Sequence, residues 1–410
     1  WTLEECVDYA IKNNISIKQS ELDLKTTDID KLEAIGGFLP TLNGNANYSM
    51  NTGASINPVT NQFQNETFKS MSASANSGIM LFNGLANWKT LQRAKLSKIA
   101  NSYRLDKMKD DIALSIANSY LQILFNKEQL KVQKNQNLIT KENIKRTQEL
   151  IQAGSLPAGD IYELQATDAS QEQQIVNTEN ALLIAKIGLC QTLLLEDYAN
   201  FDISDEVMDL PMTDMTNETQ ESILEKAKES VKDVKIAMAN VDVAKKDVAL
   251  SRSSYLPTLT GFLGYNTRWA ESIPFNFIDQ LTLFDGTAVG LQLNVPILNG
   301  FATRGRVQRA KINQERSEFQ LKQAELDLER NVYQAYNDVI NAKKSFEAAQ
   351  KTLEARKQSF NFSKERYEVG LMNSFDFSQS TIAFENAQSE VLRTKYDYLF
   401  RTKILEFYFG

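Results

Sequence analysis

Four segments of the chain alternate between apolar and polar residues with a period of two. In the first segment Leu42, Tyr48 and Met50 share one side, and in the last Val289 and Leu291 do so. Because successive side chains of a strand point to opposite faces, the pattern predicts four strands with one apolar face each. Strands of about ten residues with this alternation are typical of membrane β-barrels. A soluble β-sandwich with one face in water would show the same alternation.

The four strands pair into two predicted hairpins, over residues 40–82 and 257–296. Polar loops over 51–66 and 270–284 are expected to join the strands of each hairpin and, in a membrane protein, to face the outside of the cell. Each hairpin follows a Leu-Pro-Thr-Leu motif and leads to an Asn-Gly pair, both of which interrupt regular structure. The predicted junction turns between strands and helices are therefore Pro40, Asn83, Gly84, Pro257, Asn299 and Gly300.

Two long segments without proline, over 86–152 and 302–368, carry apolar residues at helical spacing, as at Ile112, Ile116 and Tyr120. At about 1.5 Å per residue, a helix of this length spans roughly 100 Å. The apolar stripe is narrow and polar residues fill the remainder. This pattern is typical of a helix that packs only against lateral neighbours, as in a coiled coil.

Each long helix ends at a glycine, Gly154 or Gly370, and a shorter return helix is predicted after it. The return helices cover about 159–195 and 374–408, so two antiparallel helical hairpins result. Their tips are the segments GSLPAGD and GLMNSFD. Two further helices are predicted before the strand hairpins, over residues 3–36 and 218–254.

The chain repeats itself. Gly84 and Gly154 recur as Gly300 and Gly370, in each case 216 positions later (300 − 84 and 370 − 154). General similarity between helices would not reproduce the positions of residues that break helices. The predicted organisation is therefore a first structural repeat, a linker and a second structural repeat, over residues 1–200, 201–217 and 218–410.

The composition excludes several classes of function. The chain has no histidine and two cysteines, whereas zinc sites and Ser-His or Cys-His catalysis depend on histidine. The glycines of Gly154–Gly159 have the spacing of a phosphate loop but lack the lysine that follows it. We therefore expect no enzyme, no cofactor and no metal site. The net charge of −7 also disfavours nucleic acid as a partner, because phosphate binding needs a basic face.

No run of about 18 apolar residues is present, so the sequence predicts no transmembrane helix, and a membrane role would rest on the strands. Trp1 opens directly into a helical pattern with no signal peptide before it, and we interpret the chain as processed or trimmed.

Four strands are too few to close a barrel in a membrane. An open sheet edge in lipid leaves backbone groups unsatisfied, at a cost of several kcal/mol each. Two copies of the chain would form eight strands with an interior filled by side chains, whereas three copies would form twelve strands with a lumen. The pattern therefore predicts an oligomer in which the copies share one barrel.

In this arrangement of elements the chain resembles the TolC-like outer membrane factors, the outer membrane efflux protein family, over nearly all of its length. The resemblance rests on the duplicated order of two strands, a long helix and a short helix. It also rests on the Leu-Pro-Thr-Leu and Asn-Gly motifs, on the opening Trp1–Cys6 and on the second tip Arg366–Leu371.

The resemblance implies a mainly α fold with membrane β: a homotrimer whose 12-stranded β-barrel is continuous with a long 12-helix α-barrel, with two internal repeats per chain. It implies a Gram-negative outer membrane location, surrounded by outer-membrane lipid and extending into the periplasm. It also implies that a periplasmic adaptor protein docks on the helical tips and that an inner-membrane pump supplies the energy. The expected function is a passive exit duct for drugs or other small molecules.

The resemblance also suggests a gate at the periplasmic tips. In the family a tip tyrosine and a tip aspartate hydrogen-bond in the closed state, and Tyr367 and Asp160 occupy those positions here. Asp376 matches a second acidic position that faces the lumen, and Gln379 stands at a further acidic position. Met372 replaces an arginine often found after the second tip glycine, so the latch and the cation-binding ring are expected to be weaker. The expected adaptor-docking residues are Gly154, Ser155, Leu156, Arg366, Gly370 and Leu371.

Alternatives remain open for the site and for the function. Asp160 and Asp376 lie near helix starts, where a carboxylate offsets the helix dipole, so capping alone would explain them. Tyr367 could equally be a packing residue. The same duct could serve type I protein secretion, and a soluble coiled-coil scaffold is an alternative from a different class.

The two cysteines lie on predicted helix ends that meet near the middle of the tube. The helix that begins at residue 3 and the return helix that ends near 195 both stop there, so Cys6 and Cys190 are expected at comparable heights. A disulfide would staple this region in the oxidising periplasm. The alternative is two separate small apolar residues on helix seams.

Overall fold

The computed structural model describes residues 1–56, 61–204 and 219–409. The chain divides into two compact units, each assembled from segments that are distant in sequence. Unit 1 comprises Trp1–Leu22, Tyr103–Lys235 and Lys322–Gly410, and unit 2 comprises Asp23–Ser102 and Ile236–Leu321. Within the described ranges, no helix contains a stretch long and apolar enough to cross a membrane.

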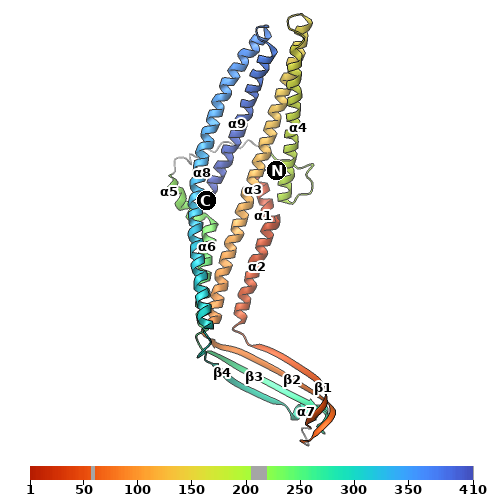
Figure 1. The fold of residues 1–410 in the computed structure, drawn as a ribbon, viewed down its shortest axis with the longest axis vertical. Helices are drawn as coiled ribbons and strands as arrows, with labels where there is room; N and C mark the ends of the chain where they lie inside the picture. The colour runs from red at the N-terminus through yellow and green to blue at the C-terminus, as the bar shows by residue number, and fades with distance from the viewer. Residues whose placement is uncertain (57–60, 205–218, 410) are drawn as a thin grey trace. The chain divides into compact units, whose positions relative to one another are not determined.

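Unit 2 contains an antiparallel sheet in the order β1-β2-β3-β4 (Figure 1). The strands are β1 (Thr41–Ile56), β2 (Phe63–Asn83), β3 (Thr258–Ala270) and β4 (Gly286–Asn294). Tyr48 pairs with Met71, which in turn pairs with Trp269. Because cross-strand partners share a face, the apolar residues of neighbouring strands form one continuous apolar face, as the alternation predicts.

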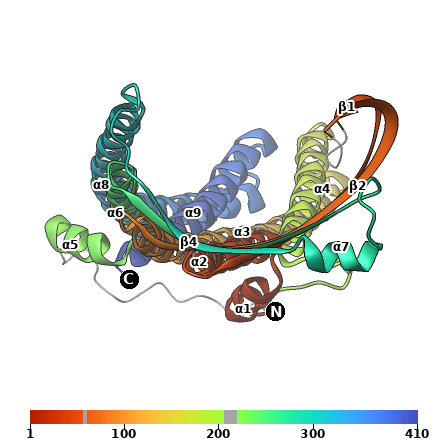
Figure 2. The ribbon, with the colours of Figure 1, turned by 90° about the horizontal axis from the view of Figure 1, so that it is seen from below.

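The structure differs from the sequence prediction in both strand connections. Residues 51–66 were predicted as a loop, but β1 extends to Ile56, which pairs with Phe63 at the start of β2. Small polar side chains pair across this extension, and the hydroxyls of Thr52 and Thr67 lie 3.1 Å apart. The predicted loop over 270–284 contains a short helix, α7 (Phe277–Leu283), which packs beside the end of β3 (Figure 2).

The first helix of each repeat is broken, where the sequence predicts it to be continuous. The break in the first repeat lies at Asn14, between α1 (Leu3–Asn13) and α2 (Ile15–Gly36). Its side-chain oxygen accepts the N–H of Ser16 at 2.9 Å, and its amide donates to the carbonyl of Thr192 at 3.0 Å. Asn14 thus caps the new helix and ties it to another element, which compensates for the interrupted backbone ladder. The second repeat has the same break, at Val231 between α5 (Gln220–Ser230) and α6 (Lys232–Ser253).

The long helices are α3 (Ala86–Gln152) and α8 (Ala302–Glu368), and each is 67 residues long. Each is followed by a return helix, α4 (Asp160–Leu193) or α9 (Ser374–Phe409), so the order of elements occurs twice. In unit 1, α4 packs against α9.

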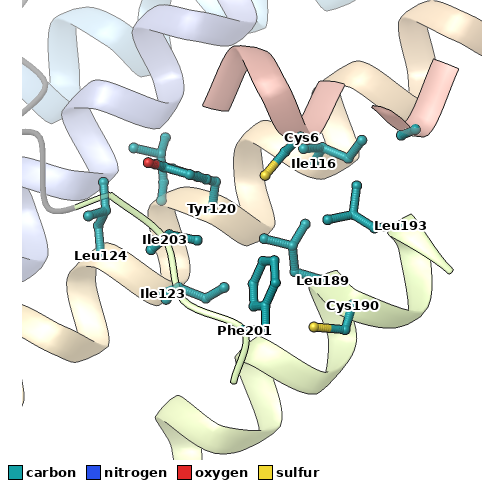
Figure 3. Close-up of a cluster of buried hydrophobic side chains, with 12 residues drawn as sticks. Cys6, Ile116, Tyr120, Ile123, Leu124, Leu189, Cys190, Leu193, Phe201 and Ile203 are labelled. Atoms are coloured by element: carbon teal, nitrogen blue, oxygen red, sulfur yellow. The ribbon is translucent and has the colours of Figure 1, made fainter. Parts of the chain in front are cut away.

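The two cysteines contribute to one buried apolar cluster in unit 1 (Figure 3). Cys6 comes from α1 and Cys190 from α4, and both are free thiols in this structure. Their shared location agrees with the sequence argument, but the disulfide is not formed. Burial raises the pKa of the Cys6 thiol to about 11 and also raises the pKa of Cys190. Since the thiolate is the reactive form, burial disfavours thiol chemistry here and favours the packing interpretation.

The Asn-Gly turns after β2 and β4 need left-handed backbone. Gly84 has a φ of 65° and Gly300 a φ of 57°. The Asn83 amide donates to the Asn87 side chain at 2.7 Å, and the Asn299 amide donates to the Thr303 hydroxyl at 2.6 Å. The two turns differ in what surrounds them: a Cβ on Gly84 would lie 2.7 Å from the Ser253 carbonyl oxygen, whereas one on Gly300 would meet nothing within 4 Å.

This difference predicts unequal costs for the same substitution. Gly84→Ala and Gly300→Ala both place an L-residue in left-handed backbone, at roughly 1–2 kcal/mol. Only Gly84→Ala also forces the backbone of Ser253 to move, which adds roughly 1–3 kcal/mol of overpacking. Denaturant unfolding in detergent, followed by circular dichroism, should show the larger loss of stability for Gly84→Ala. Equal losses would contradict the close approach at Gly84.

Candidate functional site

The α3–α4 hairpin turns through a glycine C-cap. Gly154 has a φ of 75°, and its N–H bonds to the Ile151 carbonyl at 2.9 Å. The N–H of Ser155 bonds to the Leu150 carbonyl at 2.9 Å. These two bonds satisfy the last carbonyls of α3 in a Schellman motif. Leu156 then packs against a buried aromatic cluster in unit 1.

The α8–α9 hairpin ends in the same way. Gly370 has a φ of 76°, and its N–H bonds to the Tyr367 carbonyl at 3.1 Å. The N–H of Leu371 bonds to the Arg366 carbonyl at 2.8 Å. The shared geometry explains why a glycine stands at both tips, because left-handed backbone is costly for residues with a Cβ.

Tyr367 belongs to a stack of aromatic rings. Its ring is 4% exposed and lies parallel to the ring of Phe377, with centroids 4.6 Å apart. Phe360 stacks on Phe377 at 6.0 Å and on Phe384 at 5.0 Å. The stack joins α8 to α9, and Leu164 of α4 packs against it. Tyr367 is thus a packing residue through its ring.

The Tyr367 hydroxyl has a partner that the sequence did not indicate. It lies 2.8 Å from the hydroxyl of Thr147, a fully buried residue of α3. Thr147, rather than the expected Asp160, is therefore the hydrogen-bond partner of Tyr367 in this structure. Burial raises the pKa of the Tyr367 phenol, the hydrogen bond with Thr147 lowers this pKa, and the negative charge of Asp160 raises it. The contact links the α3–α4 hairpin to the α8–α9 hairpin.

The acidic residues of the site lie at helix starts. The Asp376 N–H donates to Asn373 Oδ1 at 2.8 Å, and the Asn373 amide donates to Asp376 Oδ2 at 3.0 Å. Asn373 thus caps the start of α9, and Asp376 lies in the first turn of that helix, where a carboxylate interacts favourably with the helix dipole. Asp160 is the first residue of α4, where its negative charge interacts favourably with the helix dipole. Gln379 is exposed on the first turns of α9.

Large apolar side chains are exposed at both tips. Val369, Leu371 and Phe375 project from the α8–α9 tip, and Tyr162 from the start of α4. Apolar groups gathered at a protein surface are characteristic of interaction sites. Arg366 lies beside them with its guanidinium near the Leu371 carbonyl, at 3.5 Å.

A seam of polar side chains joins the two hairpins beyond the aromatic stack. Gln171 of α4 donates to Glu385 of α9 at 2.7 Å, and Gln136 of α3 donates to Gln388 of α9 at 2.6 Å. Asn137 contacts Gln171 at 3.4 Å. The Gln171–Glu385 and Gln136–Gln388 bonds cross from one hairpin to the other and oppose their separation, whereas the Asn137–Gln171 contact joins α3 to α4 within one hairpin.

The polar seam is only partly satisfied. Burial raises the pKa of Glu385, although the hydrogen bond from Gln171 lowers it. Glu385 and Glu163 line the same cavity, of about 270 Å³. Among the residues that the structure describes, the side-chain oxygens of Gln129 and Gln133 are buried without a hydrogen-bond partner. Unsatisfied buried polar groups cost free energy, so the seam is less stable than an apolar core would be.

Thr147, Phe377 and Glu385 were not predicted as site residues from the sequence. A signal for the aromatic stack was present, because Phe360 and Tyr367 are seven residues apart on α8, and Phe377 and Phe384 are seven apart on α9. Such spacing places side chains on one face of a helix. In the described part of the chain, no group of three acidic, Cys or His residues is arranged to hold a metal ion.

The Tyr367–Thr147 contact can be tested by a double-mutant cycle. Tyr367→Phe and Thr147→Val should show a coupling of about 0.5–1.5 kcal/mol, the usual net value of a hydrogen bond. Native-state hydrogen exchange of the tip amides would measure it. The matched cycle of Tyr367→Phe with Asp160→Asn should show the smaller coupling. A larger coupling in the Asp160 cycle than in the Thr147 cycle would show that Asp160, and not Thr147, is the partner of Tyr367.

Comparison with known proteins follows the same division of the chain. The family model described as outer membrane efflux protein matches residues 6–193 and 223–410. The chain is 22% identical over 316 residues to the outer membrane protein TolC of Vibrio cholerae serotype O1, a match that covers 77% of this chain and 71% of TolC. It is 21% identical over 315 residues to the proteases secretion protein PrtF of Dickeya chrysanthemi, with 77% and 67% covered. Among solved structures, the CmeC outer membrane channel of Campylobacter jejuni superposes with a TM-score of 0.86 at 17% identity, covering 100% of this chain and 85% of CmeC.

Proposed function

The chain belongs to the outer membrane efflux protein family, and from this premise we propose that it is the outer-membrane exit duct of a tripartite efflux system. It is a channel protein of the Gram-negative outer membrane and not an enzyme. In the proposed system it passively conducts drugs or other small molecules that an inner-membrane pump and a periplasmic adaptor deliver.

The observation that carries the proposal is the exposed apolar face of the sheet. Val289 is 80% exposed, and Leu42, Leu291 and Leu293 on the same face are also exposed. The opposite face carries asparagine and serine, for example Asn45 opposite Ser74. An apolar face toward lipid and a polar face toward a lumen are the arrangement of a membrane barrel. Since β1 and β4 are the outer strands of the described sheet, closure requires further copies of the chain.

The helices of unit 2 support a trimer in the same way. Salt bridges join α2 to α3, between Asp28 and Lys98, and α3 to α6, between Arg93 and Asp247. The helix α8 lies beside α6 (Figures 1 and 2), so α2 and α8 are the outer members of the row. Both outer helices expose apolar residues, including Ile29, Leu32 and Ile35 on α2 and Ile312 and Phe319 on α8. We expect α8 of one copy to pack against α2 of the next.

A charge on this seam should prevent assembly. Phe319 is 65% exposed in the single chain, and burial of an unpaired carboxylate at its position would be strongly unfavourable. Light scattering in detergent should therefore report a trimer for the wild type and a loss of trimer for Phe319→Glu. The neighbouring exposed position provides the control, because Gln320→Glu introduces the same charge beside the seam. A trimer that persists in Phe319→Glu would show that the seam lies elsewhere.

The helical tips are proposed as the gate and as the adaptor-docking site. Tyr367, Asp160, Asp376 and Gln379 form the proposed gate, together with Thr147. The Tyr367–Thr147 bond, the aromatic stack and the polar seam all hold the α8–α9 hairpin against the α3–α4 hairpin. Opening would require these contacts to separate. The docking residues proposed are Gly154, Ser155, Leu156, Arg366, Gly370 and Leu371, beside the exposed apolar side chains of the tips.

The tip turn offers a direct test of docking. Gly370→Val places a β-branched residue in left-handed backbone and should distort the turn, whereas Gly370→Asn should preserve it because asparagine tolerates this conformation. In cells, Gly370→Val should abolish efflux while trimers remain in the outer membrane, and Gly370→Asn should retain efflux. Normal drug resistance in Gly370→Val would refute the assignment of the tip.

The alternatives differ in their support. A soluble coiled-coil scaffold is incompatible with membership of a family of outer-membrane channels. Type I protein secretion is the second candidate, and the similarity to PrtF, which is named a proteases secretion protein, favours it. The two candidates use the same duct and differ in the pump and the cargo.

A further inference from the structure

We infer that α7, with the residues that flank it, lies in the boundary between lipid and water at the outer leaflet and contacts lipid through its exposed apolar side chains. The inference rests on the proposed function, because it requires the sheet to span the membrane with its apolar face toward lipid. It assigns an anchoring surface to the segment that joins β3 to β4.

The helix α7 packs on the apolar face of the sheet. The Thr267 hydroxyl donates to the Leu281 carbonyl at 2.7 Å, and the Trp269 ring lies 5.8 Å from the ring of Phe277. Thr267 and Trp269 alternate with the polar-face residues of β3, so they share a face with Leu263 and Tyr265. The register carries this face onto β4, where Leu263 pairs with Val289. The segment that contains α7 therefore covers the end of the face that meets lipid, not the asparagine- and serine-rich face.

A buried glutamine holds α7 in place. Gln280 is fully buried, and its side-chain oxygen accepts the Ala270 N–H at 2.9 Å. Its amide group lies within hydrogen-bond distance of the carbonyls of Ala270, Ile273 and Phe275, at 3.1, 3.1 and 2.8 Å. These contacts fix a helix of only seven residues, which would not be stable alone. The apolar side chains of α7 are thus displayed on a rigid element.

The side chains that α7 displays fit a lipid boundary. Ile278 is 71% exposed, and Phe275, Phe277 and Leu283 are also exposed. Together with Trp269, whose ring packs against Phe277, these side chains continue the apolar face of the sheet beyond the end of β3. Aromatic residues are enriched at the membrane–water interfaces of membrane barrels, where part of the side chain contacts lipid and part contacts water.

Charged groups lie next to Trp269 and on α7, where we expect the segment to meet water. Lys69 and Glu271 form an ion pair at 3.0 Å directly beyond Met71 and Trp269, on the same face. Asp279 is exposed on α7 itself. A segment that combines apolar side chains with a few charges lies in the interfacial plane rather than in the hydrocarbon core.

Site-specific fluorescence quenching tests the inference. The native thiols of Cys6 and Cys190 are buried, so a maleimide probe reacts with an introduced surface cysteine. The probe is placed on the Ile278→Cys variant of the full chain, reconstituted as trimers in phosphatidylcholine vesicles with brominated acyl chains. Val289→Cys provides a reference on the apolar face, and Asn45→Cys provides a reference on the polar face.

The expected result is that brominated lipid quenches the Ile278→Cys probe to an extent similar to the Val289→Cys probe, while aqueous iodide quenches mainly the Asn45→Cys probe. Two results would overturn the inference alone, with the Val289→Cys probe still quenched by lipid. Quenching of the Ile278→Cys probe by iodide only would place α7 in water, and protection from both quenchers would place it against another copy of the chain. Failure of lipid to quench the Val289→Cys probe would instead overturn the proposed orientation of the sheet, and the inference with it.

Discussion

The backbone groups along the outer edges of β1 and β4 impose the constraint on which the rest of the structure depends. Hydrocarbon offers no hydrogen-bond partners, so an edge strand in a membrane must find another strand. The described sheet has an apolar face and a polar face but no closure within the chain. In the proposed trimer, pairing with further copies satisfies the edges, and the same closure brings the exposed apolar residues of α2 and α8 into a seam. The oligomer is thus a consequence of the sheet, and the lumen is a consequence of the oligomer.

The tips combine a rigid turn with an interface of modest strength. Both turns use glycine in left-handed backbone, and both satisfy the last helix carbonyls. Between the hairpins, however, the contacts include hydroxyl and amide groups that water could replace, such as the Tyr367–Thr147 and Gln171–Glu385 pairs. Because a net hydrogen bond contributes only about 0.5–1.5 kcal/mol, such an interface can separate without unfolding either hairpin. This is a suitable construction for a proposed gate.

The two repeats share a plan but differ where their surroundings differ. Gly84 is enclosed by Ser253 and Leu256, whereas Gly300 faces open space, although both have the same left-handed backbone. At the start of α9 the Asn373 side chain accepts the Asp376 N–H, whereas the N-cap of α4 is Gly159, which provides no side-chain bond. Only β3 and β4 are joined through a helix, held by Gln280, in the described residues. Duplication thus produced equivalent backbones whose side chains have separate tasks.

Much of the architecture could be predicted from the sequence because it depends on local periodicity. Alternation of apolar and polar residues with a period of two predicted the strands. The spacing of Ile112, Ile116 and Tyr120 predicted a helix, and Gly154 and Gly370 predicted the ends of the long helices. The connections were predicted less well: polar residues of 51–66 suggested a loop, although cross-strand pairing makes much of that segment strand. The helix α7 depends on Gln280, whose side chain bonds to backbone groups of Ala270, Ile273 and Phe275. These groups lie close to Gln280 only because the chain turns back after the end of β3. Likewise, only the packing of α3 against α8 selects Thr147 as the partner of Tyr367, because a hydrogen bond between residues 220 positions apart depends on the arrangement of helices and leaves no periodic signal in the chain.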